Sequence, residues 1–307
     1  MFENSKKLPS EESQKDLNES AERKNPIINI EESDHEKTLS RSARQQDIET
    51  AKKAADDKNQ KKLEDLYQGF FGSKENCELL AQYIPEELYS LESPTIVDAG
   101  SSQGILGNYV REEFAKRGSK PRLVMIDTNS VAMKQSQVQA EKIVGNLTES
   151  PLISESADLV ILRSVLQYVA MEEQIKILEE INRILKPGGV LLSQFCSYAT
   201  QKQAEYFNEL FISAKRKVAF CGKEEGIKMH QQIFDVITEA EGPTLHETFD
   251  EFFKQRINAP NSQIEEAEKY ISEHTEELDG VLTSKEKPYS WEIPYTIAIC
   301  KKRQNNN

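Results

Sequence analysis

The sequence of 307 residues has only four cysteines, one tryptophan and no long run of apolar residues. The cysteines form no C-x-x-C pair and have no metal-ligand spacing, which excludes the usual zinc patterns and is typical of a reduced protein. Nothing approaches a run of about 18 apolar residues, and the N-terminus lacks the apolar core of a signal peptide. We therefore expect a cytoplasmic protein without a membrane segment or a metal site.

Basic residues are also in deficit, with 39 lysines and arginines against 52 aspartates and glutamates, and the net charge is -13. Nucleic-acid binding normally rests on basic surfaces that release counterions, so this balance disfavours a nucleic acid as the partner. We expect a small-molecule substrate instead. No feature of the sequence specifies the oligomeric state.

The composition changes along the chain, because large apolar residues are almost absent from the first 60 positions. Such a segment cannot bury enough surface to offset its ordering entropy, and we predict that it is disordered. The expected organisation is a charged tail at 1–60, a folded domain at 61–302 with a core at 94–196, a helical cap at 197–291 and a final strand at 292–302, and a polar tail at 303–307.

Within the core, short apolar runs alternate with amphipathic helical patterns. Strands are predicted at 95–98, 122–127, 142–144, 158–163 and 190–195, with helices at 104–117, 130–141 and 172–186 between them and a last strand at 295–300. This alternation predicts a parallel, doubly wound α/β sheet of the Rossmann-like kind. A ligand site is expected beyond the carboxyl ends of its strands.

The most informative segment is VDAGSSQG, residues 97–104, where an apolar strand meets an acidic residue and a loop of small residues. Asp98 stands directly before the loop, where its charge would repel a pyrophosphate but attract a cationic amine or sulfonium. Asp127 ends the next strand, where a carboxylate can accept both hydroxyls of a ribose. The two acids favour a sulfonium nucleoside over a dinucleotide.

This segment resembles the first motif of the class I S-adenosylmethionine-dependent methyltransferases, with Ser102 where the family most often has its middle glycine. Three further segments resemble later motifs of that family in the correct order: Gly145–Leu152, Ala157–Val169 and Leu185–Leu192. The resemblance covers about 95–195 and implies the seven-stranded sheet of the family, S-adenosyl-L-methionine as cofactor and methyl transfer as the reaction.

Carried onto this chain, the resemblance implies the following cofactor-binding residues: Asp98, Gly100, Ser101, Ser102 and Gly104 around the methionine part, Asp127 at the ribose, Asn146 and Leu147 at the adenine, and Arg163 facing the transfer zone. Two of these have a plainer alternative. Asn146 could be a turn residue, and Arg163 could pair with a surface acid.

The acceptor is less well defined. The loop also resembles, faintly, a plant-type family that methylates small carboxylic acids, which implies that Gln167 and Tyr168 grip a carboxylate; Tyr168 packing into the core is the alternative. Candidate catalytic residues are Arg163, Gln167, Tyr168 and His230. For His230, a surface or helix-capping role is the alternative. The expected acceptor is a small carboxylate or hydroxyl compound under the helical cap.

Two other functions remain open. One is a catalytically inactive methyltransferase-like module that binds or regulates. The other is a short-chain dehydrogenase, because the glycine loop fits that pattern superficially and Tyr198 and Lys202 have the Tyr-x-x-x-Lys spacing.

Overall fold

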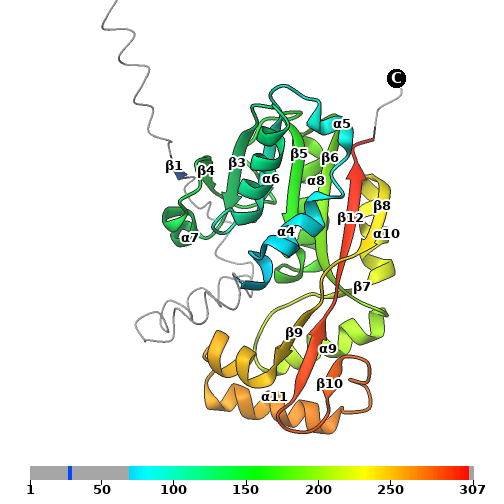
Figure 1. The fold of residues 1–307 in the computed structure, drawn as a ribbon. Helices are drawn as coiled ribbons and strands as arrows, with labels where there is room; N and C mark the ends of the chain where they lie inside the picture. Colours follow the sequence, from blue (N-terminus) through cyan, green and yellow to red (C-terminus); the bar gives the residue numbers. More distant parts are fainter. Residues whose placement is uncertain (1–26, 30–68, 304–307) are drawn as a thin grey trace, which may run out of the picture.

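The computed structural model describes residues 27–29 and 69–303, and it shows a large α/β domain with a smaller lobe at one end (Figure 1). The prediction of a disordered tail therefore falls almost wholly outside the described residues. Its one described part, Ile27–Asn29, forms strand β1 beside β4, which the sequence did not predict.

The large domain is built on a nine-stranded sheet in the order β1-β4-β3-β2-β5-β6-β12-β8, with β7 paired to β6. Its strands beyond β1 are β4 (Glu141–Val144), β3 (Arg122–Asp127), β2 (Thr95–Ala99), β5 (Ala157–Arg163), β6 (Leu185–Tyr198), β12 (Tyr295–Lys301), β8 (Asp235–Glu241) and β7 (Cys221–Gly222). All pair in parallel except β12, which runs antiparallel to both β6 and β8. The predicted doubly wound, Rossmann-like sheet is confirmed, and the strands from β4 to β8 give the implied number of seven, although β8 is not one of the strands predicted from the sequence.

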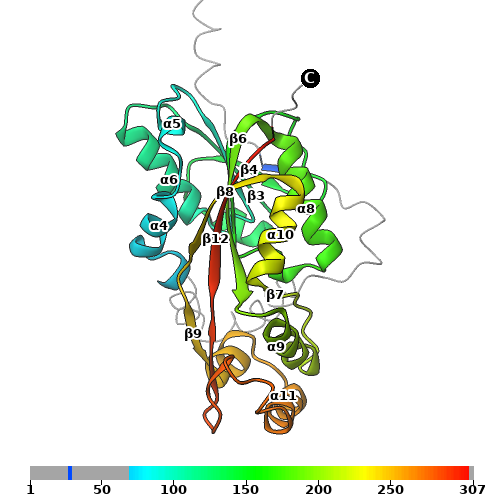
Figure 2. The same cartoon turned by 90° about the vertical axis from the view of Figure 1, so that its right-hand side faces the viewer.

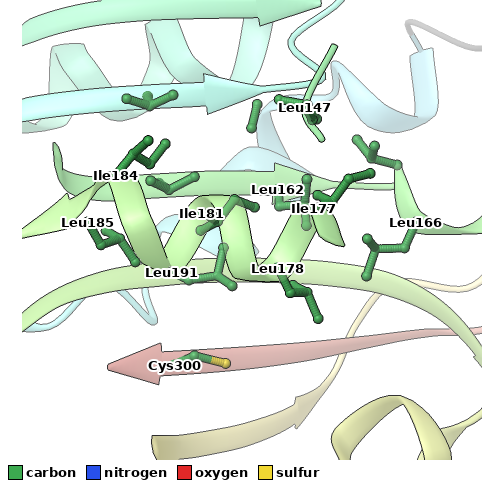
Figure 3. Close-up of a cluster of buried hydrophobic side chains, with 14 of the residues drawn as sticks. Leu147, Leu162, Leu166, Ile177, Leu178, Ile181, Ile184, Leu185, Leu191 and Cys300 are labelled. Atoms are coloured by element: carbon green, nitrogen blue, oxygen red, sulfur yellow. The ribbon is translucent and has the colours of Figure 1, made fainter. Parts of the chain in front are cut away.

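Helices cover both faces of the sheet (Figure 2). One face carries α4 (Lys74–Ala81), α5 (Glu86–Tyr89) and α6 (Ile105–Lys116), and the other carries α8 (Met171–Ile184) and α10 (Lys223–Ile233). Because side chains alternate along a strand, Val160 and Leu162 face α8 whereas Leu159 and Ile161 face α6. Figure 3 shows the α8 side, where Ile177, Ile181 and Ile184 of that helix lie beside Leu162 of β5 and Leu191 of β6.

The smaller lobe extends from the carboxyl ends of the parallel strands. It contains α9 (Gln201–Ser213), β9 (Leu245–Thr248), the π-helix η3 (Asp250–Arg256), α11 (Asn261–Glu273), β10 (Leu282–Ser284) and β11 (Ser290–Ile293). The hairpin of β8 and β12 continues into it as β9 and β11, because the amide of Gly242 donates to the carbonyl of Tyr295 (2.8 Å) and Leu245 pairs with Ile293. The lobe is thus a direct extension of the last two sheet strands.

The region after β6 differs from the mostly helical one that the sequence predicts. Strand β8 was missed because it lies at the sheet edge: three acidic residues and Ile237 face solvent, so no buried apolar run marks it. Part of this region is also β-structure, since β9 covers Leu245–Thr248 before η3 begins at Asp250. No helix among residues 69–303 is long and apolar enough to span a membrane.

Because α6 packs closely on β2, a side chain larger than glycine at position 107 should lower the stability of the fold. A Cβ on Gly107 would lie 2.6 Å from an Asp98 carboxylate oxygen and 2.8 Å from its Cβ. Gly107→Ala should therefore lower the free energy of unfolding by about 1–3 kcal/mol, measured by urea denaturation. Gly69→Ala is the control, because no atom lies within 4 Å of its built Cβ. Equal stability of the two variants would contradict this packing.

Candidate functional site

The glycine loop lies between the end of β2 and the start of α6, at the carboxyl edge of the sheet. Three of its five residues have positive φ: Gly100 (71°), Ser102 (50°) and Gly104 (80°). Gly104 has a φ that residues with a side chain rarely adopt, and a Cβ there would also displace the end of the Met125 side chain, so that position favours glycine. Ser102 occupies the left-handed region that explains why a glycine is usual there.

Two buried carboxylates fix this loop. Asp98 is 4% exposed, and its Oδ2 accepts a hydrogen bond from the Gly107 amide (3.1 Å) at the start of α6. Asp127 is 2% exposed, and its oxygens accept from the amides of Ser102 (2.7 Å) and Asn129 (2.8 Å). Asp127 therefore joins the end of β3 to the loop after β2, and Asp98 joins β2 to α6.

The loop amides are largely used within the protein. Gly100 and Ser101 donate to the Ile126 carbonyl (2.8 and 3.2 Å), Ser102 donates to Asp127, and Gly104 donates to the Ser101 carbonyl (2.8 Å). A pyrophosphate site needs backbone amides directed at the ligand. Here the loop amides already donate within the protein, and two carboxylates lie beside them. This arrangement suits a ligand that brings positive charge and hydroxyl groups, as a sulfonium nucleoside does.

The residues proposed for the adenine lie after β4. Asn146 is exposed, and its side-chain oxygen accepts from the Thr148 amide (3.1 Å), so it forms an Asx turn. Leu147 is buried against the α8 side of the core (Figure 3). The structure thus shows the turn role for Asn146, and the adenine role of both residues stays a prediction.

Arg163 ends β5 on the same face as Asp98. It is partly buried, donates to the Phe71 carbonyl, and its guanidinium lies 5.5 Å from the centre of the Phe71 ring. Burial lowers the pKa of Arg163, while Cys77 and Asp98 act against this shift. Arg163 is therefore held at the site by the segment before α4, rather than pairing with a surface acid among the described residues.

Gln167 and Tyr168 both line a small pocket between the sheet and the lobe. Both belong to the short 3₁₀-helix η2 (Leu166–Tyr168) that follows β5. Gln167 is 3% exposed; its Nε2 donates to Ser164 Oγ (2.6 Å), which lies 3.3 Å from the Tyr295 hydroxyl. No described residue provides a hydrogen-bond partner for the other polar atom of this amide, Oε1.

The rest of the pocket was not predicted from the sequence. Its wall contains Phe211, Phe220, Leu245, Phe252 and Ile293, and its polar lining includes Arg216 and Tyr295. These residues come from α9, the segment after it, β9, η3, β11 and β12. Only the folded lobe brings them to the end of β5, so no local motif could have identified them.

His230 lies away from this pocket. It is buried in α10, where Nδ1 contacts the Gly226 carbonyl (2.7 Å) and Nε2 contacts Ser193 Oγ (2.9 Å), and it stacks on Phe195. Both ring nitrogens are engaged in the core, so the structure argues against the prediction of a catalytic His230 and against a surface or capping role.

The dehydrogenase alternative also lacks support. The Tyr198 hydroxyl is buried without a hydrogen-bond partner among the described residues, and burial raises its pKa well above the ordinary value. Lys202 lies over the Tyr206 ring instead. A catalytic Tyr-Lys pair would need the lysine beside the tyrosine hydroxyl to lower that pKa.

Comparison with known proteins identifies the domain that holds the loop. Residues 97–193 match the sequence model of the family described as "Methyltransferase domain". This part of the chain is a methyltransferase domain. The family uses S-adenosyl-L-methionine, as the resemblance of the loop implied.

Individual relatives agree with this domain. The chain is 26% identical over 141 residues to the carboxy-S-adenosyl-L-methionine synthase of Pseudomonas putida and 28% identical over 134 residues to that of Pseudomonas entomophila. These matches cover 42% and 39% of this chain, and the chain spans only 56% and 53% of those relatives.

Solved structures support the fold of the methyltransferase domain. A Bacillus halodurans protein described as a methyltransferase has a TM-score of 0.60 at 18% identity. The YcgJ protein of Bacillus subtilis has a TM-score of 0.59 at 15% identity. The matches cover 75% and 76% of this chain and the whole of each of those chains.

Burial of His230 predicts a pH-dependent stability. Burial lowers its pKa to about 4, whereas an unfolded histidine titrates near ~6.5. The unfolded chain then binds the extra proton between these values, so stability falls as the pH drops from about 6.5 toward 4, by roughly 3 kcal/mol in all.

His230→Gln should flatten this part of the profile, measured by urea denaturation between pH 7.5 and pH 5. His246→Gln, at an exposed position, controls for loss of an imidazole. A wild-type slope in His230→Gln would show that other groups cause the dependence.

Proposed function

We propose that this chain is an S-adenosylmethionine-dependent methyltransferase that acts on a small-molecule acceptor. One observation carries the proposal: Asp127, which bonds the glycine loop, and Asp98, which bonds the start of α6, lie at the same sheet edge as a pocket with an aromatic wall. The carboxyl edge of a parallel sheet is where such folds bind their ligands.

In this proposal the residues of the loop and of the next two strand ends hold the cofactor. Gly100 to Gly104 and Asp98 surround its methionine part, Asp127 binds the ribose, and Asn146 and Leu147 adjoin the adenine. Arg163, held under Phe71, faces the transfer zone. The matching family model supports this assignment, and so do the loop amides, because they already donate hydrogen bonds within the protein.

S-adenosylmethionine supplies a methyl group that is already activated by the positive sulfur. The chain therefore has mainly to position the acceptor and exclude water, a contribution worth an effective molarity of about 10⁵–10⁸ M in well-aligned systems. The pocket wall excludes water on the lobe side, and Gln167, fixed by Ser164, offers one polar atom to the acceptor. A carboxylate or a hydroxyl acceptor matches such an amide.

The similarity to these relatives supports a site for the cofactor, but it does not identify the product. Their name refers to a carboxylated form of S-adenosylmethionine, which fits a site for this cofactor. The similarity spans little more than half of them, and we do not extend their product to this chain.

The ribose assignment is tested by Asp127→Ala. Loss of hydrogen bonds to a charged group costs about 1.5–3 kcal/mol, so affinity for S-adenosylhomocysteine should fall on the order of 10–100-fold, measured by isothermal titration calorimetry. Asp158→Ala is a matched control. Asp158 also accepts a backbone amide (Thr95, 2.8 Å) and pairs with Lys186, but at the start of β5, away from the site.

Both variants should lose some stability, and only Asp127→Ala should lose affinity. Equal affinity of Asp127→Ala and the wild type would remove the ribose role. Failure of the wild type to bind S-adenosylhomocysteine would overturn the proposed function.

A further inference from the structure

Gln194 is a buried amide in the second half of β6, at the carboxyl edge of the sheet. Its side chain is 1% exposed, and neither Nε2 nor Oε1 has a hydrogen-bond partner among the described residues. Leaving a buried polar atom without a partner is unfavourable, so native proteins rarely keep two in one side chain. The amide donates through Nε2 and accepts through Oε1, and a ligand with an acceptor and a donor side by side would satisfy both atoms.

This amide lies on the α6 face of the sheet, beside Arg163. Side chains alternate along a strand, and Leu192, two residues before Gln194, packs on the α6 side. Gln194 pairs in register with Arg163 of β5 and with Ile297 of β12. Because neighbouring strands are only about 4.8 Å apart, the amide and the arginine side chain start next to each other.

The segment before α4 covers this place. The centre of the Phe71 ring lies 5.5 Å from the Arg163 guanidinium carbon and 5.7 Å from the centre of the Tyr295 ring. These two residues belong to β5 and β12, the strands on either side of β6, so Phe71 lies over the buried amide. Phe71 is also close to two glycines, Gly69 and Gly72, and no atom lies within 4 Å of a Cβ built at Gly69. Glycines beside a covering segment let it move outward at low cost.

Arg163 determines which ligand suits this place. A guanidinium has five N–H donors, and Arg163 uses them on the Phe71 carbonyl and the Cys77 thiol, neither of which carries a formal charge at neutral pH. A carboxylate binds a guanidinium more strongly than a neutral carbonyl does, so it would replace the Phe71 carbonyl once the segment moves. The same carboxylate can accept from Nε2 of Gln194, and an adjacent ammonium can donate to Oε1. An α-amino-acid group carries these two charges on one carbon.

We propose that Gln194 and Arg163 bind the α-amino-acid group of the cofactor, and that Phe71 moves outward to admit it. The inference rests on the proposed function, in which S-adenosylmethionine lies at this edge of the sheet with its methionine part near Asp98. Asp98 ends β2 on the same face, where it bonds the start of α6, and the arginine and the amide follow on β5 and β6. The amino-acid group thus lies on the α4 and α6 side of the transfer zone.

The test compares S-adenosylhomocysteine with methylthioadenosine, which has the same nucleoside thioether but no amino-acid group. Isothermal titration calorimetry of the full chain should show that the wild type binds S-adenosylhomocysteine at least about 10-fold more tightly. Gln194→Met keeps the length of the side chain and removes both polar atoms. It should weaken S-adenosylhomocysteine about 10-fold, as expected for loss of a hydrogen bond to a charged group, and leave methylthioadenosine unchanged.

Gln174→Met is the matched control. Gln174 is also 1% exposed, but it lies in α8, and its amide donates to the carbonyls of Ala219 (2.9 Å) and Val169 (3.3 Å). In urea denaturation Gln174→Met should lose stability, whereas Gln194→Met should not, because its amide makes no hydrogen bond among the described residues. The affinities for S-adenosylhomocysteine should show the reverse, with a loss in Gln194→Met alone. A purely structural glutamine would not combine unreduced stability with reduced affinity.

Three results would each overturn the inference: equal binding of both ligands by the wild type, unchanged affinity of Gln194→Met for S-adenosylhomocysteine, or an equal loss for both ligands. If Gln194→Met does not fold, Gln194→Glu decides. It has the same shape, and its carboxylate would pair with Arg163 in place of the ligand, so S-adenosylhomocysteine alone should bind more weakly.

The outcomes also separate this inference from the proposed function. Tight binding of S-adenosylhomocysteine that neither Gln194 variant alters would reject the amino-acid site and leave the proposed function intact. Failure of the wild type to bind either ligand would reject the proposed function, and this inference with it.

Discussion

The hydrogen bond from the Ser102 amide of the glycine loop to Asp127 is the constraint on which the site depends. It holds Ser102, whose φ is 50°, and joins the loop after β2 to the end of β3. Asp98 does the same for α6 through the Gly107 amide, which leaves no room for a larger residue at position 107. Two negative side chains thus adjoin a loop whose amides are largely engaged within the protein, an arrangement that favours the proposed sulfonium nucleoside over a dinucleotide.

The second half of the site comes from the lobe. Because β9 and β11 continue the hairpin of β8 and β12, the lobe stands directly over the carboxyl ends of β5 and β6. Tyr295 links the two parts: it begins β12, contacts Phe71 and Ser164, and lines the pocket. The segment before α4, the end of β5 and the lobe therefore meet at one place.

The sequence predicted those strands whose burial is visible as a local run of apolar residues. Runs such as Leu123–Ile126 are apolar because both faces of a central parallel strand are covered, and they marked the strands within a few residues. Strand β8 was missed because an edge strand needs no such run. In the site, Asp98 and Asp127 were visible from their position after strands, whereas Arg216 sits in a Lys-Arg-Lys sequence that reads as a solvated turn. Its burial depends on the folded lobe, because Arg216 lines the pocket together with residues of α9, β9 and η3, and no local pattern records that arrangement.

The central claim is that the two carboxylates and the loop between them hold a sulfonium nucleoside with its reactive end toward the pocket. The most direct measurement is a crystal structure of the full chain with S-adenosylhomocysteine. The account predicts ribose hydroxyls within hydrogen-bond distance of Asp127 and a thioether sulfur facing the pocket beside Gln167 and Tyr168. A ribose placed away from Asp127, or a sulfur directed away from that pocket, would contradict it.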